Sequence, residues 1–148
     1  MSKKPVIHAV IPARGGSKGV PRKNIKEFHG KPLIHWTIQQ ALDSAYIDHV
    51  YVSTDDEEIQ QISIEGGAKA PFLRPAEIAD DHSVDVEWLI HYLEWANDTL
   101  DEDEKPDMVV HLRCTSPSRK VALIDDCIRK YLEVWETFGF GVWILILV

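Results

Sequence analysis

The chain has 148 residues, with 16 lysines and arginines against 24 aspartates and glutamates, so its formal net charge is −8. This length suits one compact domain, and a hydrophobic content of 45% is enough to build a core, which excludes a wholly disordered chain. The charge is unevenly distributed, because residues 1–31 carry a net +7 and residues 32–148 carry −15. One basic segment in an acidic body indicates a local anion-binding site and argues against a nucleic-acid-coating surface.

Cysteine content and the apolar stretches indicate a cellular location. Cys114 and Cys127 are the two cysteines of the chain, too few for a disulfide framework and without metal-ligand spacing. We expect them to be small buried residues in a reducing compartment. The first residues lack the apolar run of a signal peptide, and the longest apolar stretch, at 138–148, is about half of a membrane span. The sequence therefore predicts a cytoplasmic protein that does not bind membranes.

Short apolar runs alternate with amphipathic segments along the chain. The run at 6–13 is typical of a strand buried on both faces of a parallel sheet. Further strands are predicted at 49–54, at 107–113 and, more weakly, at 69–73. Helical periodicity predicts helices at 32–44, 55–65, 84–100 and 121 to about 137, the last with Ser118 as its N-cap. This order predicts an α/β fold with a parallel sheet and ligands at the carboxyl ends of its strands.

The C-terminal stretch 138–148 is atypical, because it is almost continuously apolar and β-branched. An exposed run of this kind would promote aggregation. We therefore expect it to be buried, either as another strand of the sheet or in a subunit contact.

The most unusual loop, residues 14–24, directly follows the first strand. Its glycines allow backbone amides to approach oxygen atoms closely, and basic side chains surround them, namely Arg14, Lys18, Arg22 and Lys23. These features are typical of a phosphate-binding loop, and the alternative is a solvated basic turn. The glycine spacing fits neither a Walker A loop nor the dinucleotide-binding pattern.

The same loop opens a series of motifs that resembles the acylneuraminate cytidylyltransferase (CMP-sialic acid synthetase) family. The blocks follow the family's order and span roughly residues 6–132. They comprise residues 11–19 with Pro21 and 23–24, residues 32–34, residues 52–59, residues 71–77 with Asp81, and residues 115–117 with Arg119. The resemblance implies a three-layer, Rossmann-like nucleotidyltransferase fold with a mostly parallel sheet. It also implies a single domain over 1–148 that is shortened at its C-terminal part, because family domains run well beyond this length.

The resemblance also implies an activity and a set of partners. The family transfers CMP from CTP to a nine-carbon acidic 2-keto sugar and releases pyrophosphate, with Mg2+ present. CTP and the acidic sugar are then the expected partners, nucleic acid is not, and a homodimer is left open. A non-catalytic nucleotide-binding remnant is the alternative function, and a kinase-like phosphotransferase is disfavoured by the missing Walker loop.

Site residues are carried over from the family motifs position by position. Lys23 and Arg14 are the expected catalytic residues, with Lys23 reaching the reacting phosphate. The expected nucleotide-binding residues are Arg14, Gly15, Gly16, Ser17, Lys18, Asn24, Arg74, Ser83 and Arg113. Two of these have structural alternatives, a surface ion pair with Glu77 for Arg74 and a helix N-cap for Ser83.

Two departures from the family pattern leave the substrate and the metal open. Arg113 stands where the family usually has glutamine, and a guanidinium group can only donate hydrogen bonds. It therefore either donates to the cytosine ring or binds the substrate carboxylate. The sugar stays open among neuraminate, legionaminate, pseudaminate and others, and a base other than cytosine stays open as well. The metal ligands are unknown, because the family's aspartates lie downstream of this chain. The carboxylate pairs at 55–56, 80–81 and 125–126 are weak candidates.

Overall fold

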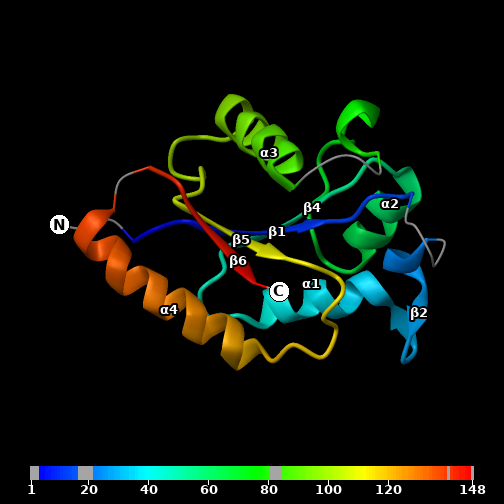
Figure 1. The fold of residues 1–148 in the computed structure, drawn as a ribbon, viewed down its shortest axis with the longest axis horizontal. Helices are drawn as coiled ribbons and strands as arrows, with labels where there is room; N and C mark the ends of the chain where they lie inside the picture. The colour runs from blue at the N-terminus through cyan, green and yellow to red at the C-terminus, as the bar shows by residue number, and fades with distance from the viewer. Residues whose placement is uncertain (1–3, 17–21, 81–84, 140, 148) are drawn as a thin grey trace.

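The computed structural model describes residues 4–16, 22–80, 85–139 and 141–147. Four strands of the described chain form the central sheet in the order β4-β1-β5-β6. They are β1 (Ile7–Pro12), β4 (His49–Ser53), β5 (Met108–Leu112) and β6 (Trp143–Leu147). Every neighbouring pair is parallel, so the predicted α/β fold with a parallel sheet is confirmed (Figure 1).

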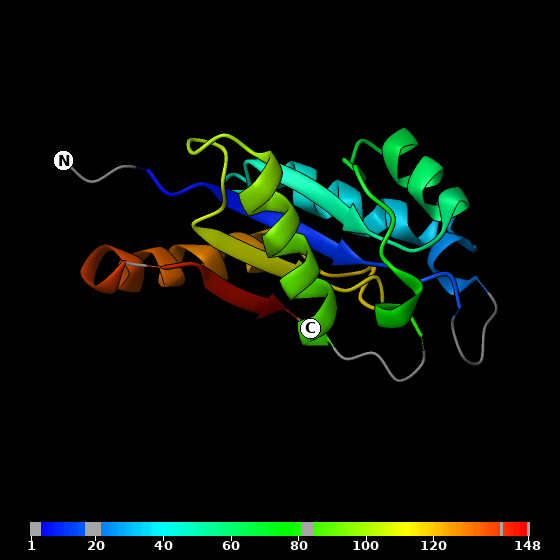
Figure 2. The same cartoon turned by 90° about the horizontal axis from the view of Figure 1, so that it is seen from above.

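Helices cover both faces of this sheet and make three layers. In Figure 1, α1 and α4 lie below the sheet and α3 lies above it, and Figure 2 shows α3 crossing over the strands. The helices are α1 (Leu33–Asp43), α2 (Glu57–Glu65), α3 (Asp85–Thr99) and α4 (Val121–Phe138), with short 3-10 turns η1 (Lys23–Ile25) and η2 (Ala76–Ile78). Among the described residues no helix is long and apolar enough to cross a membrane.

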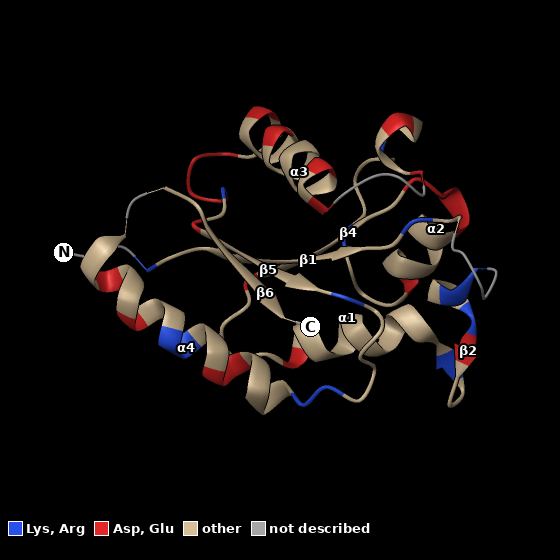
Figure 3. Cartoon of the chain, in the orientation of Figure 1, with Lys and Arg blue, Asp and Glu red and all other residues tan. Residues whose placement is uncertain are grey.

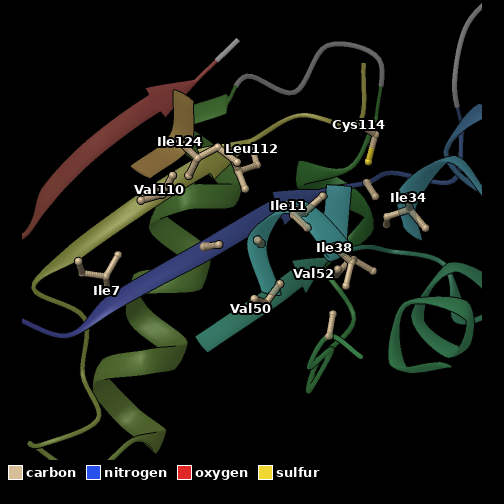
Figure 4. Close-up of a cluster of buried hydrophobic side chains, with 14 of the residues drawn as sticks. Ile7, Ile11, Ile34, Ile38, Val50, Val52, Val110, Leu112, Cys114 and Ile124 are labelled. Atoms are coloured by element: carbon tan, nitrogen blue, oxygen red, sulfur yellow. The ribbon is translucent and has the colours of Figure 1, made fainter. Parts of the chain in front are cut away.

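The first strand is buried on both faces, as its continuous apolar run predicts. Ile7 and Ile11 belong to the core beneath the sheet, together with Ile34 and Ile38 of α1 (Figure 4). Val10 belongs to a second core above the sheet, which α3 closes with Trp88, Tyr92 and Ala96. Each fully buried isoleucine contributes about 1.5–3 kcal/mol of transfer free energy, so these two cores hold β1 firmly at the centre.

The apolar C-terminal tail supplies the strand β6, and this confirms the first of its two expected fates. Residues 143–147 pair in parallel with 108–112 of β5. Leu145 is buried beneath the sheet, whereas Ile146 is 56% exposed. The strand therefore lies at the edge of the described sheet, with one face in the core.

Two local predictions need correction, and one small element was not predicted. Residues 69–73 do not form a full strand but make two isolated parallel bridges beside β4, Tyr51 with Lys69 and Thr54 with Leu73. Ser118 does not cap the last helix, because α4 begins at Val121 and its N-cap residue is Lys120. The chain before it forms a turn in which the Arg119 amide donates to the Ser116 carbonyl. A small hairpin of β2 (Glu27–Phe28) and β3 (Lys31–Pro32) was not predicted.

Candidate functional site

A pocket of about 180 Å³ lies at the carboxyl ends of the central strands. Pro12 ends β1, Arg113 follows β5, and Arg74 lies beside the end of β4, where its backbone amide donates to Thr54. The remaining lining residues are Arg14, Lys23, Asn24, Asp80, Asp85, Trp88, Cys114 and Thr115. This is the position that a parallel α/β sheet predicts for a ligand.

Five of the residues expected to bind a nucleotide or act in catalysis come together in this pocket. They are Arg14, Lys23, Asn24, Arg74 and Arg113, drawn from three separate sequence blocks. Gly15 and Gly16 follow Arg14 directly but do not line the described cavity. Ser17, Lys18 and Ser83 lie outside the described residues. Figure 3 shows lysines and arginines gathered around η1 and the β2–β3 hairpin, next to this end of the sheet.

The start of the glycine-rich loop is packed against the segment that follows β4. The Gly15 amide donates to Asp55 Oδ1 at 2.8 Å. A Cβ atom on Gly15 would lie 2.8 Å from Asp56 Oδ2, closer than carbon and oxygen can approach without a shift. A Cβ atom on Gly16 would meet none of the described residues within 4 Å. Glycine is therefore required at 15 by contact, and no such contact constrains position 16.

The far end of the loop is held by the same segment. Arg22 has a left-handed backbone, with φ of 53°, and its guanidinium donates to the two carboxylate oxygens of Asp56 at 2.6 and 2.8 Å. Glu58 lies 3.4 Å from Arg22. The ion pair raises the pKa of Arg22 and lowers that of Asp56 to about 2. Arg22 was counted among the loop's phosphate-binding charges, and the structure instead pairs it with acidic side chains.

Asp56 was named only as half of a weak metal-ligand pair, and the structure gives it structural roles in an ion pair and a helix cap. Its Oδ1 also accepts from the Ile59 amide at 3.0 Å and so caps the N-terminus of α2. The available signal was an aspartate directly before a helical run that starts with Glu57 and Glu58. Capping and ion pairing by one carboxylate couple the loop to the helix.

Asn24 and Lys23 occupy the turn η1, between the loop and the hairpin. Asn24 is buried, and its Nδ2 donates to the Arg14 carbonyl at 3.2 Å. This bond connects the two ends of the loop across the pocket. Lys23 lies beside it with its side chain in the lining of the cavity.

Arg74 is buried, with 6% of its surface exposed. Its guanidinium donates to the carbonyl oxygens of Ser53 at 3.0 Å and Ile78 at 3.3 Å. Burial lowers its pKa, and the nearby charge of Arg14 acts in the same direction. The expected alternative, a surface ion pair with Glu77, is wrong: within the described part of the chain Arg74 binds backbone oxygens and faces the pocket.

Arg113 is half-exposed and forms an ion pair with Asp85 at the start of α3. Asp85 also accepts from Trp88 Nε1 at 3.2 Å. Arg113 therefore reaches the pocket with its charge already compensated by a neighbouring carboxylate. Asp85 and Trp88 are further pocket residues that the sequence reasoning did not name.

Histidines and metal-ligand groups add little chemistry to the site. Within the described ranges no three histidine, cysteine, aspartate or glutamate side chains are placed to hold a metal ion. His8 lies in the core, where its ring nitrogens bond the Tyr92 hydroxyl and the Glu104 carbonyl, and burial lowers its pKa to about 4. His111 packs against Trp88 at a ring distance of 4.8 Å. Cys114 is buried, and burial raises the pKa of its thiol to about 12, so it is not a nucleophile at neutral pH.

Fold and pocket together define a parallel α/β protein with a cationic site at the carboxyl ends of its strands. The cytidylyltransferase family model matches residues 8–137. The chain therefore belongs to the cytidylyltransferase family.

Named relatives and solved structures agree with this assignment. The chain is 39% identical to the pseudaminic acid cytidylyltransferase of Campylobacter jejuni, over 89% of this chain and 56% of that protein. It is 38% identical to the CMP-N,N'-diacetyllegionaminic acid synthase of Legionella pneumophila, over 92% of this chain and 56% of that protein. The chain thus spans about half the length of these relatives.

A solved structure supports the same fold. CMP:2-keto-3-deoxy-manno-octonic acid synthetase, solved with CTP, superposes with a TM-score of 0.70 at 25% identity, covering 86% of this chain and 48% of that one. The predicted three-layer nucleotidyltransferase fold is thereby confirmed.

Proposed function

We propose that this chain transfers a cytidylyl group from CTP to an acidic nine-carbon 2-keto sugar and releases pyrophosphate. Family membership supports the cytidylyl transfer. The sugar class follows from relatives whose names specify pseudaminic and diacetyllegionaminic acid, and from N-acylneuraminate cytidylyltransferase B of Danio rerio, 38% identical over 82% of this chain and 27% of that protein.

The convergence of Arg14, Lys23 and Arg74 on one pocket carries the proposal. Two of these cations come from the loop 14–24 and the third from a segment about 50 positions further along the chain, and all three line the same cavity. A triphosphate is the polyanion that such a site suits, since fixed positive charges in a partly desolvated site bind phosphate oxygens strongly. Arg74 is already held by two backbone carbonyls, so its guanidinium needs little ordering when a ligand binds.

The proposed chemistry is a displacement at the α-phosphate of CTP. A hydroxyl oxygen of the sugar forms a bond to the α-phosphorus, loses its proton, and the bond to the departing pyrophosphate breaks with its electron pair. Negative charge therefore grows on the transferred and departing phosphates. Lys23 and Arg14 would stabilise that charge, which is where positioning and electrostatics contribute most to phosphoryl transfer.

Mg2+ belongs to the proposal through the family, but the described residues do not supply a set that fits it. Asp80 and Asp85 are the carboxylates of the pocket, and Asp85 is engaged by Arg113 and Trp88. Mg2+ takes many of its ligands from phosphates and water. We therefore assign no step to a metal ion in this chain.

Pyrophosphate release tests the proposal directly. CTP and Mg2+ are incubated with N-acetylneuraminate, legionaminate and pseudaminate in parallel, and we expect release with at least one sugar. Lys23→Ala should lower turnover by about 100-fold or more. Lys26→Ala, an exposed lysine in the same basic segment, is the matched control and should leave turnover unchanged. Equal loss in both variants would contradict a catalytic role for Lys23.

A nucleotide-binding module without chemistry is the second candidate, because no three metal-ligating side chains lie together among the described residues. Such a module would be stabilised against heat by CTP but would release no pyrophosphate with any of the three sugars. A preference for ATP over CTP in the same thermal assay would argue for a phosphotransferase and against both candidates.

A further inference from the structure

Arg119 lies behind the pocket wall and is buried, with 9% of its surface exposed. Its Nη1 donates to Oε1 of Gln40 at 3.0 Å, and its Nη2 donates to the carbonyl oxygen of Arg113 at 3.1 Å. Neither Arg119 nor Gln40 lines the cavity. Arg113 does, so the second bond connects a buried guanidinium to the backbone of a pocket residue.

Gln40 extends the same network from α1. It is 7% exposed, and its Nε2 donates to the carbonyl oxygens of Pro117 at 2.9 Å and Ser116 at 3.4 Å. The Arg119 amide also donates to Ser116 at 3.1 Å. Two side chains thus bind main-chain carbonyls at both ends of the segment 113–117, whose middle residues, Cys114 and Thr115, line the pocket.

This arrangement is expensive in free energy. Burial lowers the pKa of Arg119, and in the described part of the chain its side-chain hydrogen bonds go to neutral oxygens and not to a carboxylate. Its Nε is buried and has no hydrogen-bond partner among the described atoms. A buried cation without an anionic partner costs stability, and an apolar side chain could fill the same space more cheaply. Packing alone therefore does not explain why an arginine occupies position 119.

We propose that Arg119 and Gln40 are positioning residues that hold the segment 113–117 in the shape required for binding at the pocket. The proposal rests on the proposed function, because it assigns these two residues to that same site. They act through the backbone of Arg113, Ser116 and Pro117 and do not touch the substrate. Without them, the wall formed by Cys114 and Thr115 would sample several conformations, and binding would have to order it again.

Hydrogen exchange of the ligand-free chain tests the positioning directly. In Gln40→Met, which keeps the side-chain length and removes the side-chain amide, we expect the backbone amide of Arg119, which donates to the Ser116 carbonyl at 3.1 Å, to exchange at least about 10-fold faster, while β1 and β4 keep their protection. Gln39→Met is the matched control: it is the exposed neighbour on α1, its side-chain amide donates to Asp43 Oδ1 at 2.8 Å, and it should change neither region. Unchanged exchange at the Arg119 amide, or an equal increase throughout the sheet, would overturn the proposal.

Kinetics supply a second readout. Gln40→Met should lower kcat/KM for pyrophosphate release by about 10-fold or more at a Tm close to that of the parent chain, and Arg119→Lys should recover part of the loss caused by Arg119→Met. A loss that follows Tm across all variants would make the two residues merely structural. If the parent chain releases no pyrophosphate, the proposed function fails, and the exchange experiment, which needs no turnover, still decides whether Arg119 and Gln40 position the wall.

Discussion

Arg22 and Asp56 are joined by two parallel hydrogen bonds of 2.6 and 2.8 Å, across 34 positions of sequence. The pair fastens the end of the glycine-rich loop to the first turn of α2, which Asp56 also caps. Gly15, at the start of the loop, lies so close to the same carboxylate that an added Cβ atom would be 2.8 Å from its Oδ2. One aspartate thus lies beside both described ends of the loop that carries the proposed triphosphate site.

Gly15→Ala is expected to weaken nucleotide binding by distorting the loop. The added methyl group would lie 2.8 Å from Asp56 Oδ2 and 3.0 Å from its Cβ, so either the loop or the carboxylate must move. We expect the stabilisation by CTP, measured as a shift in Tm, to fall well below that of the parent chain. Gly16→Ala is the matched control, because none of the described residues lies within 4 Å of the added carbon. Equal effects of the two substitutions would contradict the packing argument.

Asp56→Asn should lower stability, and the effect should depend on pH. The substitution weakens a helix cap and removes the partner of Arg22, and losing a cap costs about 0.5–2 kcal/mol. The native pKa of Asp56 is lowered from 3.8 to about 2, so its ionised form stabilises the fold. That contribution is complete above about pH 4 and disappears as the pH falls through 2.

Urea denaturation of the parent chain and Asp56→Asn across that range measures this difference. The two free energies of unfolding should converge between pH 4 and 2. Glu58→Gln, which changes a more exposed carboxylate 3.4 Å from Arg22, should show a difference of at most about 1 kcal/mol at neutral pH. A gap between parent and Asp56→Asn that stays constant down to pH 2 would show that the ion pair does not stabilise the fold.

Hydrophobic periodicity predicted the sheet and its helices because the core imposes that periodicity directly. The run at 6–13 is buried on both faces in β1, and the stripe on residues 84–100 packs over the sheet as α3. The segment 69–73 was harder to predict correctly. Its backbone pairs with residues 51 and 54 at two isolated bridges, and its polar and apolar residues do not alternate clearly. The two-residue strands of the hairpin are too short to leave any periodic signal.

The pocket cations were predictable from local motifs, whereas their partners were not. Arg14, Lys23 and Arg74 stand in recognisable sequence motifs. Because ligands of a parallel sheet bind at the carboxyl ends of its strands, the predicted strands also indicate where these residues gather. The partners of Arg22, Arg113 and Arg119 lie 34, 28 and 79 positions away in the sequence. Such pairs depend on the packing of whole elements, which a single sequence does not specify.

His111→Phe is expected to make the chain less sensitive to mild acid. His111 is buried against Trp88, and burial lowers its pKa from 6.5 to about 4. The unfolded chain therefore binds more protons than the folded chain between these values, so stability present above pH 6.5 is lost as the pH falls toward 4, with a slope of up to about 1.4 kcal/mol per unit.

Phenylalanine keeps the ring contact with Trp88 and removes the titration. Between pH 7 and 4.5, the free energy of unfolding should fall less steeply in His111→Phe than in the parent chain. His29→Asn, at the exposed hairpin turn, is the control and should follow the parent curve. Parallel curves for all three proteins would contradict a role of His111 in acid sensitivity.

Arg113→Met tests whether this arginine contacts the base or the acidic sugar. Asp85 already compensates the charge of Arg113, and Asp85 is itself held by Trp88 Nε1 at 3.2 Å. A compensated guanidinium attracts a second carboxylate weakly but still donates hydrogen bonds to a neutral acceptor, such as the carbonyl oxygen of cytosine. We therefore expect Arg113→Met, which removes every side-chain donor, to raise KM for CTP by about 10-fold and to change KM for the sugar little. Steady-state pyrophosphate release with each substrate varied in turn measures both constants, and a rise confined to the sugar would assign Arg113 to the substrate carboxylate instead.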